Sequence, residues 1–294
     1  MNFIFHYAGF SEKLNKISGI IPYFCSMLAL KYLFKAPFHL LRTSSGRQLL
    51  SVFWRYGDKP RYRPAKVKFG NYRLEVPDCF SWVWQFEEIY YEEYYKFQAA
   101  TPTPVIYDCG ANVGMSILYF KELYPQARIK AYEAEPQIAE YLTKNLRNNG
   151  INDVEVIQKA VWKDNLGVEF GEGQSDDASI YGQGKKKTVP SVRLRDELAK
   201  EKSIDFLKID IEGAETDVLP DCTDMLDRVQ HLFVEFHAYI GQSQELAKIL
   251  EVIEKAGFRY YIDTNQHRKA PFVNHRYRNN NVMDLQLNIS ARRP

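Results

Sequence analysis

In four places a largely apolar, strand-like segment of the sequence is followed directly by side chains that can lose or accept a proton. The positions are Asp108, Glu133, Asp210 and the triplet Glu235-Phe236-His237. If the four runs are parallel strands of one sheet, their carboxyl ends meet at one edge, where open α/β sheets bind ligands. Carboxylates and an imidazole gathered there could hold hydroxyl groups, hold a cation or act as a base.

A glycine-containing loop follows the first of these acids. Gly110, Asn112 and Gly114 separate the apolar run 105–107 from an expected helix, and glycine permits a tight turn and a close approach of backbone to a ligand. The N–H groups at the helix start favour an anionic group. The loop matches neither the Gly-x-Gly-x-x-Gly pattern of dinucleotide sites nor a Walker loop, so it does not identify the cofactor by itself.

Glu133 lies 19 residues after Gly114, at the end of the second apolar run. An acid at this place can accept hydrogen bonds from both hydroxyls of a ribose, as in the dinucleotide fingerprint. Glu135 is near enough to be that acid instead, and either residue could be a solvated loop glutamate. We predict that Glu133 binds the ribose of a nucleotide-like cofactor.

The segment from residue 208 to residue 215 carries the densest set of charges. A buried strand delivers Lys208, Asp210, Glu212 and Glu215 within eight residues. Carboxylates this close repel one another, so we expect a cation, a positively charged cofactor or a shared proton beside them. Glu215 alone is explained as well by its place in the first turn of a helix, which the helix dipole favours.

His237 is the side chain best suited to act as a base near neutral pH, and Glu212 is the second choice. Glu235 could simply orient the imidazole. A lone histidine is often structural, and Asp210, Glu212 and His237 could instead bind a divalent metal. The sequence leaves the choice between base and metal ligand open.

From residue 104 onwards strand-like and helix-like patterns alternate, which predicts an α/β fold with a mostly parallel sheet and helices on both faces. We expect strands at 105–107, 127–132, 154–157, 204–209, 232–234, 258–262 and 282–289, and helices at 113–124, 136–148, 193–200 and 243–256. The Thr-Pro-Thr-Pro segment before the first strand predicts a boundary between a smaller, mainly helical region, residues 1–100, and a second domain, residues 101–294.

The first hundred residues carry no catalytic motif. Residues 67–69 and 72–76 alternate in the strand period around Gly70-Asn71 and predict a hairpin. Residues 81–97 repeat aromatic side chains at steps of three and four, which predicts an amphipathic helix. Its aromatic side chains could stack against a sugar, although core packing is the commoner use of such a face.

Composition restricts the class of protein. The chain of 294 residues is 45% apolar with a formal charge of +2, which fits a globular protein and gives no reason to expect nucleic acid as a partner. Its four cysteines have no paired spacing, which fits a reducing, cytoplasmic compartment. No secretory signal is evident, and Pro22 and Lys31 interrupt the apolar segment 17–34. We therefore expect no transmembrane segment there but a packed helix, with peripheral membrane contact as the alternative.

Together these motifs resemble, in order and spacing, the motif series of FkbM-family methyltransferases. The matching segments are Asp108–Gly114, Tyr132–Pro136, Asn145–Gly150, Lys208–Glu215 and Val234–His237. The resemblance covers roughly residues 104–262 and implies a Rossmann-like class I methyltransferase fold that uses S-adenosylmethionine. Members generally methylate hydroxyl groups, often on sugars or natural-product scaffolds, so the resemblance implies an O-methyltransferase, with polysaccharide biosynthesis as one setting.

The resemblance also implies roles for individual residues. The residues that would hold the methionine part of the cofactor are Asp108, Gly110, Asn112 and Gly114. Glu133 would hold the ribose, and Lys159 and Ala160 would lie beside the adenine. Asp210 and Glu212 would lie beside the sulfonium and the acceptor hydroxyl. Many members have Glu-Pro where this chain has Glu-Ala-Glu-Pro, which keeps the choice between Glu133 and Glu135 open.

Two other functions fit the pattern less well. A nicotinamide-dependent (NAD) oxidoreductase on a similar sheet is disfavoured because the dinucleotide glycine pattern is missing. A non-catalytic binding protein on the same scaffold is disfavoured because the strand-end acids are all present. We therefore expect S-adenosylmethionine-dependent methylation of a hydroxyl group on a glycan or another small molecule.

Overall fold

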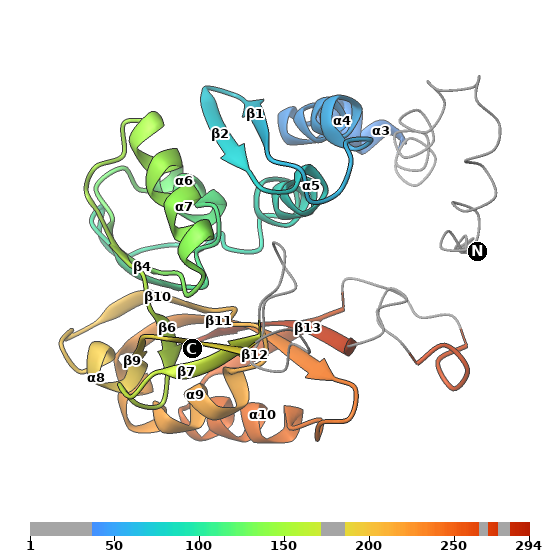
Figure 1. The fold of residues 1–294 in the computed structure, drawn as a ribbon. Helices are drawn as coiled ribbons and strands as arrows, with labels where there is room; N and C mark the ends of the chain where they lie inside the picture. The colour runs from blue at the N-terminus through green and yellow to red at the C-terminus, as the bar shows by residue number, and fades with distance from the viewer. Residues whose placement is uncertain (1–36, 172–185, 265–269, 276–282) are drawn as a thin grey trace.

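The computed structural model describes residues 37–171, 186–264, 270–275 and 283–294, and Figure 1 labels their helices and strands. The N-terminal part contains helices and one hairpin. Its elements are α3 Pro37–Arg42, α4 Ser44–Tyr56, β1 Ala65–Phe69, β2 Tyr72–Val76, α5 Cys79–Phe86 and the π-helical turn η1 Glu87–Tyr91. Strands β1 and β2 pair antiparallel, which confirms the predicted hairpin.

A seven-stranded sheet with the strand order β12-β13-β11-β10-β3-β4-β5 forms the centre of the molecule. Its strands are β3 Val105–Cys109, β4 Arg128–Tyr132, β5 Val154–Ile157, β10 Ile204–Ile209, β11 Val229–Tyr239, β12 Arg259–Asp263 and β13 Met283–Arg292. Only β13 runs antiparallel to its neighbours in this sheet, so the predicted mostly parallel α/β sheet is confirmed. The strand order reverses between β3 and β10, and such a switch point is where α/β sheets bind ligands.

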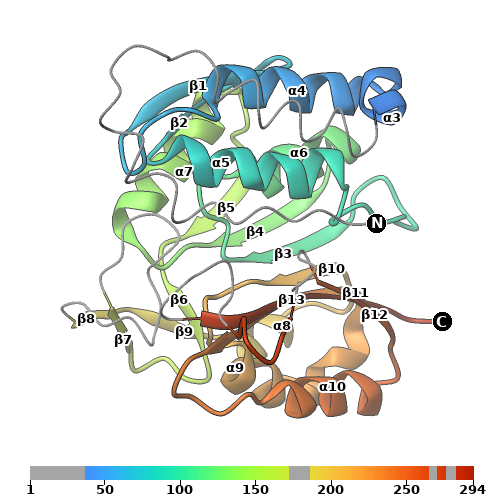
Figure 2. The same ribbon diagram turned by 90° about the vertical axis from the view of Figure 1, so that its right-hand side faces the viewer.

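Helices cover both faces of the sheet (Figure 2). One face carries α6 Met115–Leu123 and α7 Pro136–Asn148 together with the N-terminal part, and the opposite face carries α8 Leu194–Leu198, α9 Glu215–Asp221, the 3-10 turn η2 Thr223–Arg228 and α10 Leu246–Lys255. The segment between β5 and α8 forms two small sheets. They pair β6 Ala160–Trp162 with β9 Ser191–Arg193, and β7 Val168–Gly171 with β8 Lys186–Val189.

The hydrophobic core continues across the expected boundary at residue 100. One cluster joins buried side chains of α4, α5 and the hairpin to those of α6, β3 and β4. The Trp82 indole N–H points to the sulfur of Met115 at 3.0 Å, and the Asn145 amide donates to the carbonyl oxygens of Glu75 and Val113. The N-terminal part therefore packs directly on the helices that border the glycine loop.

The helix predicted over residues 81–97 is too long. The helical turns end at Tyr91, and Glu93 takes a left-handed φ of +55°. The chain then turns so that two aromatic side chains of the predicted helix reach the sheet, with ring centroids 4.9 Å apart for Tyr95–Phe233 and for Phe97–Phe206. Both aromatic residues are buried, so core packing explains this part of the aromatic pattern.

Strand β11 extends beyond the predicted range 232–234. Strand β10 ends at Ile209, opposite Val234, whereas the antiparallel partner β13 continues the pairing of β11 as far as Tyr239. Glu235 and His237 therefore lie inside a strand that projects past the end of β10. Because they are two residues apart, their side chains point to the same face.

The described helices include none that is long and apolar enough to cross a bilayer. The apolar segment 17–34 lies outside the described residues, so the packed helix expected there stays a prediction.

Candidate active site

A cavity opens at the switch point, beside the carboxyl ends of β3, β4 and β10. Six of the nine predicted site residues line it, namely Gly110, Asn112, Glu133, Ala160, Asp210 and Glu212. The other three, Asp108, Gly114 and His237, are buried residues outside this lining, and His237 Nε2 lies 3.7 Å from Oε2 of the lining residue Glu212. The topology thus brings together residues that are up to 129 positions apart in the chain.

The glycine loop is shaped by two glycines and an asparagine with positive φ. Gly110 has a φ of +93°, and a Cβ atom there would lie 1.8 Å from the carbonyl oxygen of Asp210. The close approach that we expected toward a ligand is therefore made to the backbone of Asp210, directly after β10. Gly114, with φ +96°, packs against α7. Asn112 has φ +48°, which asparagine tolerates well, and its Oδ1 accepts the N–H of Val113 at 2.8 Å.

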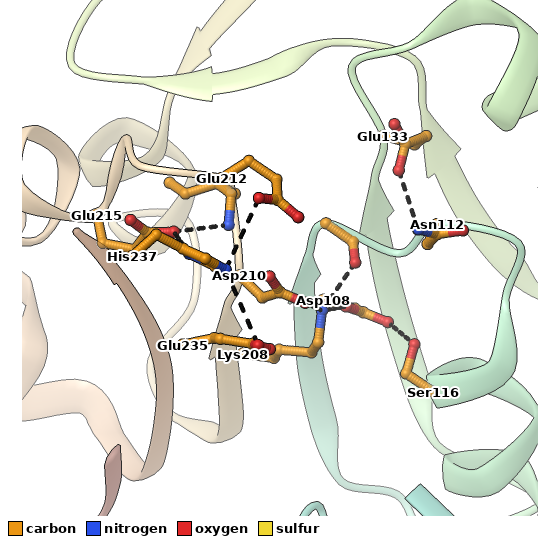
Figure 3. Close-up of polar contacts among 12 residues, drawn as sticks. Asp108, Asn112, Ser116, Glu133, Lys208, Asp210, Glu212, Glu215, Glu235 and His237 are labelled. Carbon is orange, nitrogen blue, oxygen red and sulfur yellow. Dashed lines mark hydrogen bonds and ion pairs between the residues drawn. The ribbon is translucent and has the colours of Figure 1, made fainter. Parts of the chain in front are cut away.

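Glu133 is held in place by two backbone groups, and Figure 3 shows its contact with Asn112. Its Oε2 accepts the N–H of Asn112 at 2.9 Å, and its Oε1 accepts the N–H of Glu135 at 3.0 Å. Burial raises the pKa of Glu133 to about 7, although these two hydrogen bonds act in the opposite direction. Glu135 lines the same cavity, so the choice of Glu133 as the ribose acid stays a prediction.

Lys208 is a buried cation that joins the strand ends. It lies opposite Asp108 in the β3–β10 ladder, with its Nζ 3.3 Å from Asp108 Oδ1, 3.0 Å from Asp210 Oδ2 and 2.7 Å from the carbonyl oxygen of Gly110. Burial alone would lower the pKa of Lys208, but the carboxylates of Asp210 and Asp108 outweigh burial and raise it well above its usual value. Lys208 is therefore charged and fixes the loop and the acids in one arrangement.

Asp108 faces the protein interior and not the cavity, which differs from the direct cofactor contact that the resemblance implied. It is completely buried, and its Oδ2 accepts a hydrogen bond from the Ser116 hydroxyl on α6. Its other oxygen faces Lys208. The role that the geometry supports is to tie β3, α6 and β10 together behind the glycine loop.

His237 is surrounded by three carboxylates (Figure 3). Its Nδ1 lies 3.1 Å from Glu215 Oε1, and its Nε2 lies 3.7 Å from Glu212 Oε2 and 3.8 Å from Glu235 Oε1. The same oxygen of Glu215 accepts two backbone N–H groups of the loop before α9. The acid that orients the imidazole is therefore Glu215, whereas the sequence suggested Glu235.

These contacts determine where protons reside in the absence of a ligand. Burial alone would lower the pKa of His237, but the carboxylates of Glu212 and Glu215 outweigh it and raise the pKa well above its usual value. Burial, helped by Asp210, raises the pKa of Glu235 well above the usual range of a carboxyl group. The neighbouring carboxylates therefore favour the protonated imidazole, which is not the form that acts as a general base.

The loop between β10 and α9 is conformationally strained next to the cavity. Glu212 has a φ of +54°, which a side chain with a Cβ adopts at a cost of about 1–2 kcal/mol. The Tyr239 hydroxyl lies 3.3 Å from the Glu212 carbonyl oxygen and from its Oε2. Strain of this kind is typical of functional sites.

The far end of the cavity contains an aromatic side chain that the sequence analysis did not single out. Lys159 and Ala160 line the cavity where the resemblance implied an adenine, and the half-buried Trp162 lines it with them. Ala160 and Trp162 lie two residues apart on β6 and so share a face. That strand period was the available signal for Trp162.

The chain was compared with protein families and with known proteins. The Methyltransferase FkbM domain family matches residues 108–260. Methyltransferase 1 of Beauveria bassiana (strain ARSEF 2860) is 26% identical over 204 residues, which are 60% of this chain and 81% of that protein. The 2-O-methyltransferase NoeI of Sinorhizobium fredii (strain NBRC 101917 / NGR234) is 24% identical over 166 residues, which are 48% of this chain and 68% of that protein.

Among solved structures, M. jannaschii TYW2 in complex with AdoMet is similar with a TM-score of 0.43 and 12% identity, covering 80% of this chain and 89% of that chain. The family match covers more than half of the chain, from Asp108 in β3 to Tyr260 in β12, and contains the glycine loop, Glu133 and the acids around His237. The chain therefore belongs to the FkbM family of S-adenosylmethionine-dependent methyltransferases.

Proposed function

We propose that this methyltransferase transfers the methyl group to a hydroxyl oxygen of a sugar, a glycan or another small molecule. The observation that carries the proposal is the position of four side chains, which we call the strand-end cluster: Asp210, Glu212, Glu235 and His237. Asp210 and Glu212 line the cofactor cavity, and the other two lie directly behind them.

A hydroxyl acceptor needs such a cluster. In the displacement, the acceptor oxygen bonds to the methyl carbon while the carbon–sulfur bond breaks, and the hydroxyl proton has to leave. A sugar hydroxyl is a poor nucleophile, so removal or stabilisation of this proton accelerates transfer. The protein's further contribution is alignment of donor and acceptor, which Lys208 and Glu215 support by fixing the cluster.

Two further observations support the finer parts of the proposal. The relative NoeI is named a 2-O-methyltransferase, which agrees with an oxygen acceptor. The described cysteines, Cys79, Cys109 and Cys222, are buried thiols without disulfides, which agrees with a cytoplasmic protein.

The test uses S-adenosylmethionine with an isotopically labelled methyl group and a panel of sugars, nucleotide sugars and oligosaccharides. We expect S-adenosylhomocysteine to form only with a suitable acceptor, and fragment masses to place the label on oxygen. Glu212→Gln should slow transfer about a hundredfold or more while cofactor affinity changes little. Label on nitrogen or carbon would contradict the proposal, cofactor binding without turnover on any acceptor would favour a binding protein, and binding of NAD in place of S-adenosylmethionine would favour an oxidoreductase.

A further inference from the structure

We propose that the strand-end cluster is a binding site for a divalent cation of the Mn²⁺ type, which holds the acceptor hydroxyl beside the cofactor. The role of the cation rests on the proposed function, whereas the binding of the cation does not. The argument depends on four features of the cluster: the spacing of its ligand atoms, the support of its histidine, a buried carboxyl group, and its charge.

The spacing of the ligand atoms suits a cation. Asp210, Glu212 and His237 each offer one ligand atom, and these atoms lie within 4.8 Å of one another. Glu212 Oε2 and Glu235 Oε1 lie 3.7 Å and 3.8 Å from His237 Nε2. A six-coordinate cation with bonds of about 2.1 Å holds adjacent ligand atoms roughly 3 Å apart and opposite ones roughly 4.2 Å apart. Small side-chain movements would therefore close the cluster around a cation.

His237 is supported as metal-binding histidines are. A ligating imidazole usually gives its second N–H to a carboxylate, which fixes the ring and directs the other nitrogen to the metal. Here Nδ1 faces Glu215 Oε1 at 3.1 Å, and Glu215 is itself completely buried and held by two backbone N–H groups. This arrangement leaves Nε2 directed into the cluster, toward Glu212 and Glu235 (Figure 3).

Glu235 provides an independent indication of a ligand. Its side chain is more than nine-tenths buried. Its Oε1 lies 3.8 Å from His237 Nε2, beyond hydrogen-bond distance. A buried carboxyl group is costly to ionise unless it is paired or coordinates a metal, and a cation between Glu235 and the imidazole would let it ionise.

The charges around the cluster favour a doubly charged partner. Even without Glu212, the described residues place four carboxylates next to two cationic side chains. The carboxylates are Asp108, Asp210, Glu215 and Glu235, and the cations are Lys208 and His237. Coordination needs Glu235 ionised and His237 neutral, so cation binding would release their protons and leave Lys208 as the remaining cation of these two; a divalent cation offsets the resulting negative charge. Several carboxylates with one imidazole suit Mn²⁺, which accepts oxygen ligands and histidine nitrogen.

The cation would act on the acceptor. A hydroxyl group bound to it loses its proton more readily, as metal-bound water does. During transfer the new oxygen–carbon bond forms, the carbon–sulfur bond breaks, S-adenosylhomocysteine leaves, and the hydroxyl proton passes to water. Because Asp210 and Glu212 also line the cofactor cavity, the bound hydroxyl would lie beside the sulfonium.

The test measures cation binding directly, without methyl transfer. The full chain is treated with EDTA, dialysed and titrated with Mn²⁺, and the signal of free Mn²⁺ is followed by electron paramagnetic resonance. We expect one Mn²⁺ to bind per chain. His237→Asn and Glu235→Gln should each weaken binding at least about tenfold. No loss of the free signal at millimolar Mn²⁺, or equal affinity of both variants and the unchanged protein, would overturn the proposal.

Glu133→Gln is the matched control, because it removes a carboxylate from the same cavity but outside the cluster. It should bind Mn²⁺ as the unchanged protein does while losing cofactor affinity. Glu235→Gln preserves side-chain volume and tests the site if His237→Asn fails to fold, which circular dichroism would show. If the protein binds no Mn²⁺ but still binds the cofactor and methylates a hydroxyl group, only the proposed cation site is refuted. If the protein binds Mn²⁺ but methylates no hydroxyl group, only the proposed function is refuted.

Discussion

The Glu133 carboxylate makes cofactor binding depend on charge, and Glu133→Gln should remove most of the affinity. Both oxygens of Glu133 already accept a backbone N–H, each keeps a second lone pair, and the residue lines the cavity. Two ribose hydroxyls donating to these lone pairs contribute about 1.5–3 kcal/mol each. An amide replaces one acceptor by a donor and removes the charge from the other. A loss of about 3 kcal/mol corresponds to roughly a hundredfold weaker binding.

The pH dependence follows from the same carboxyl group. Without cofactor the pKa of Glu133 is about 7, because the group is buried. Ribose hydroxyls stabilise the ionised form, so the pKa is lower in the complex and binding releases a proton. Affinity should therefore rise as pH increases toward 7 and level off above it, with up to about a tenfold loss per pH unit below 7.

Isothermal titration calorimetry with S-adenosylmethionine between pH 6 and 8 measures both effects, and buffers of different ionisation enthalpy count the released proton. Glu135→Gln is the control, since Glu135 lines the same cavity but positions Glu133 through its backbone. The reasoning would be refuted by unchanged affinity in Glu133→Gln, by an affinity of the unchanged protein that is flat across this range, or by an equal loss in both variants.

Three further predictions concern the support and the far end of the site. Gly110→Ala should lower the free energy of unfolding by about 2 kcal/mol or more, because its φ is +93° and its Cβ would meet the Asp210 carbonyl oxygen; an unchanged urea midpoint would contradict this. Lys208→Met should lower the free energy of unfolding by about 3–5 kcal/mol in the same urea titration, because it leaves Asp108 and Asp210 without their buried cation. A decrease of less than about 1 kcal/mol would show that the ion pairs of Lys208 contribute little to stability. Trp162→Ala should weaken binding of 5′-methylthioadenosine about tenfold while Trp162→Phe retains it, if the aromatic ring stacks on adenine; equal affinities in a fluorescence titration would exclude stacking.

The parallel strands and the glycine loop could be predicted because their signals are local. A short segment such as 204–209, in which four of six residues are apolar and acids follow, indicates a buried strand and its end. The helix over residues 81–97 could be predicted only in part. Aromatic spacing does not distinguish a residue that continues a helix from one that leaves it to fill a core, as Tyr95 does against Phe233.

The support of the site depends on long-range pairing that one sequence does not reveal. Glu235 and His237 project past β10 because β13, about fifty residues further along the chain, continues to pair with β11. The choice of Glu215 over Glu235 as the partner of Nδ1 follows from the path of the loop before α9. The inward direction of Asp108 follows from its register with Lys208 across β3 and β10.

The most direct test of the account is amide hydrogen exchange with and without S-adenosylmethionine. If the switch point holds the cofactor, exchange should slow at residues 110–114, 132–135, 159–162 and 210–213, and stay unchanged in β12 at the far edge of the sheet. NAD at the same concentration should give no such protection. Protection confined to other segments, equal protection by NAD, or no protection at saturating cofactor would contradict the assignment of this cavity.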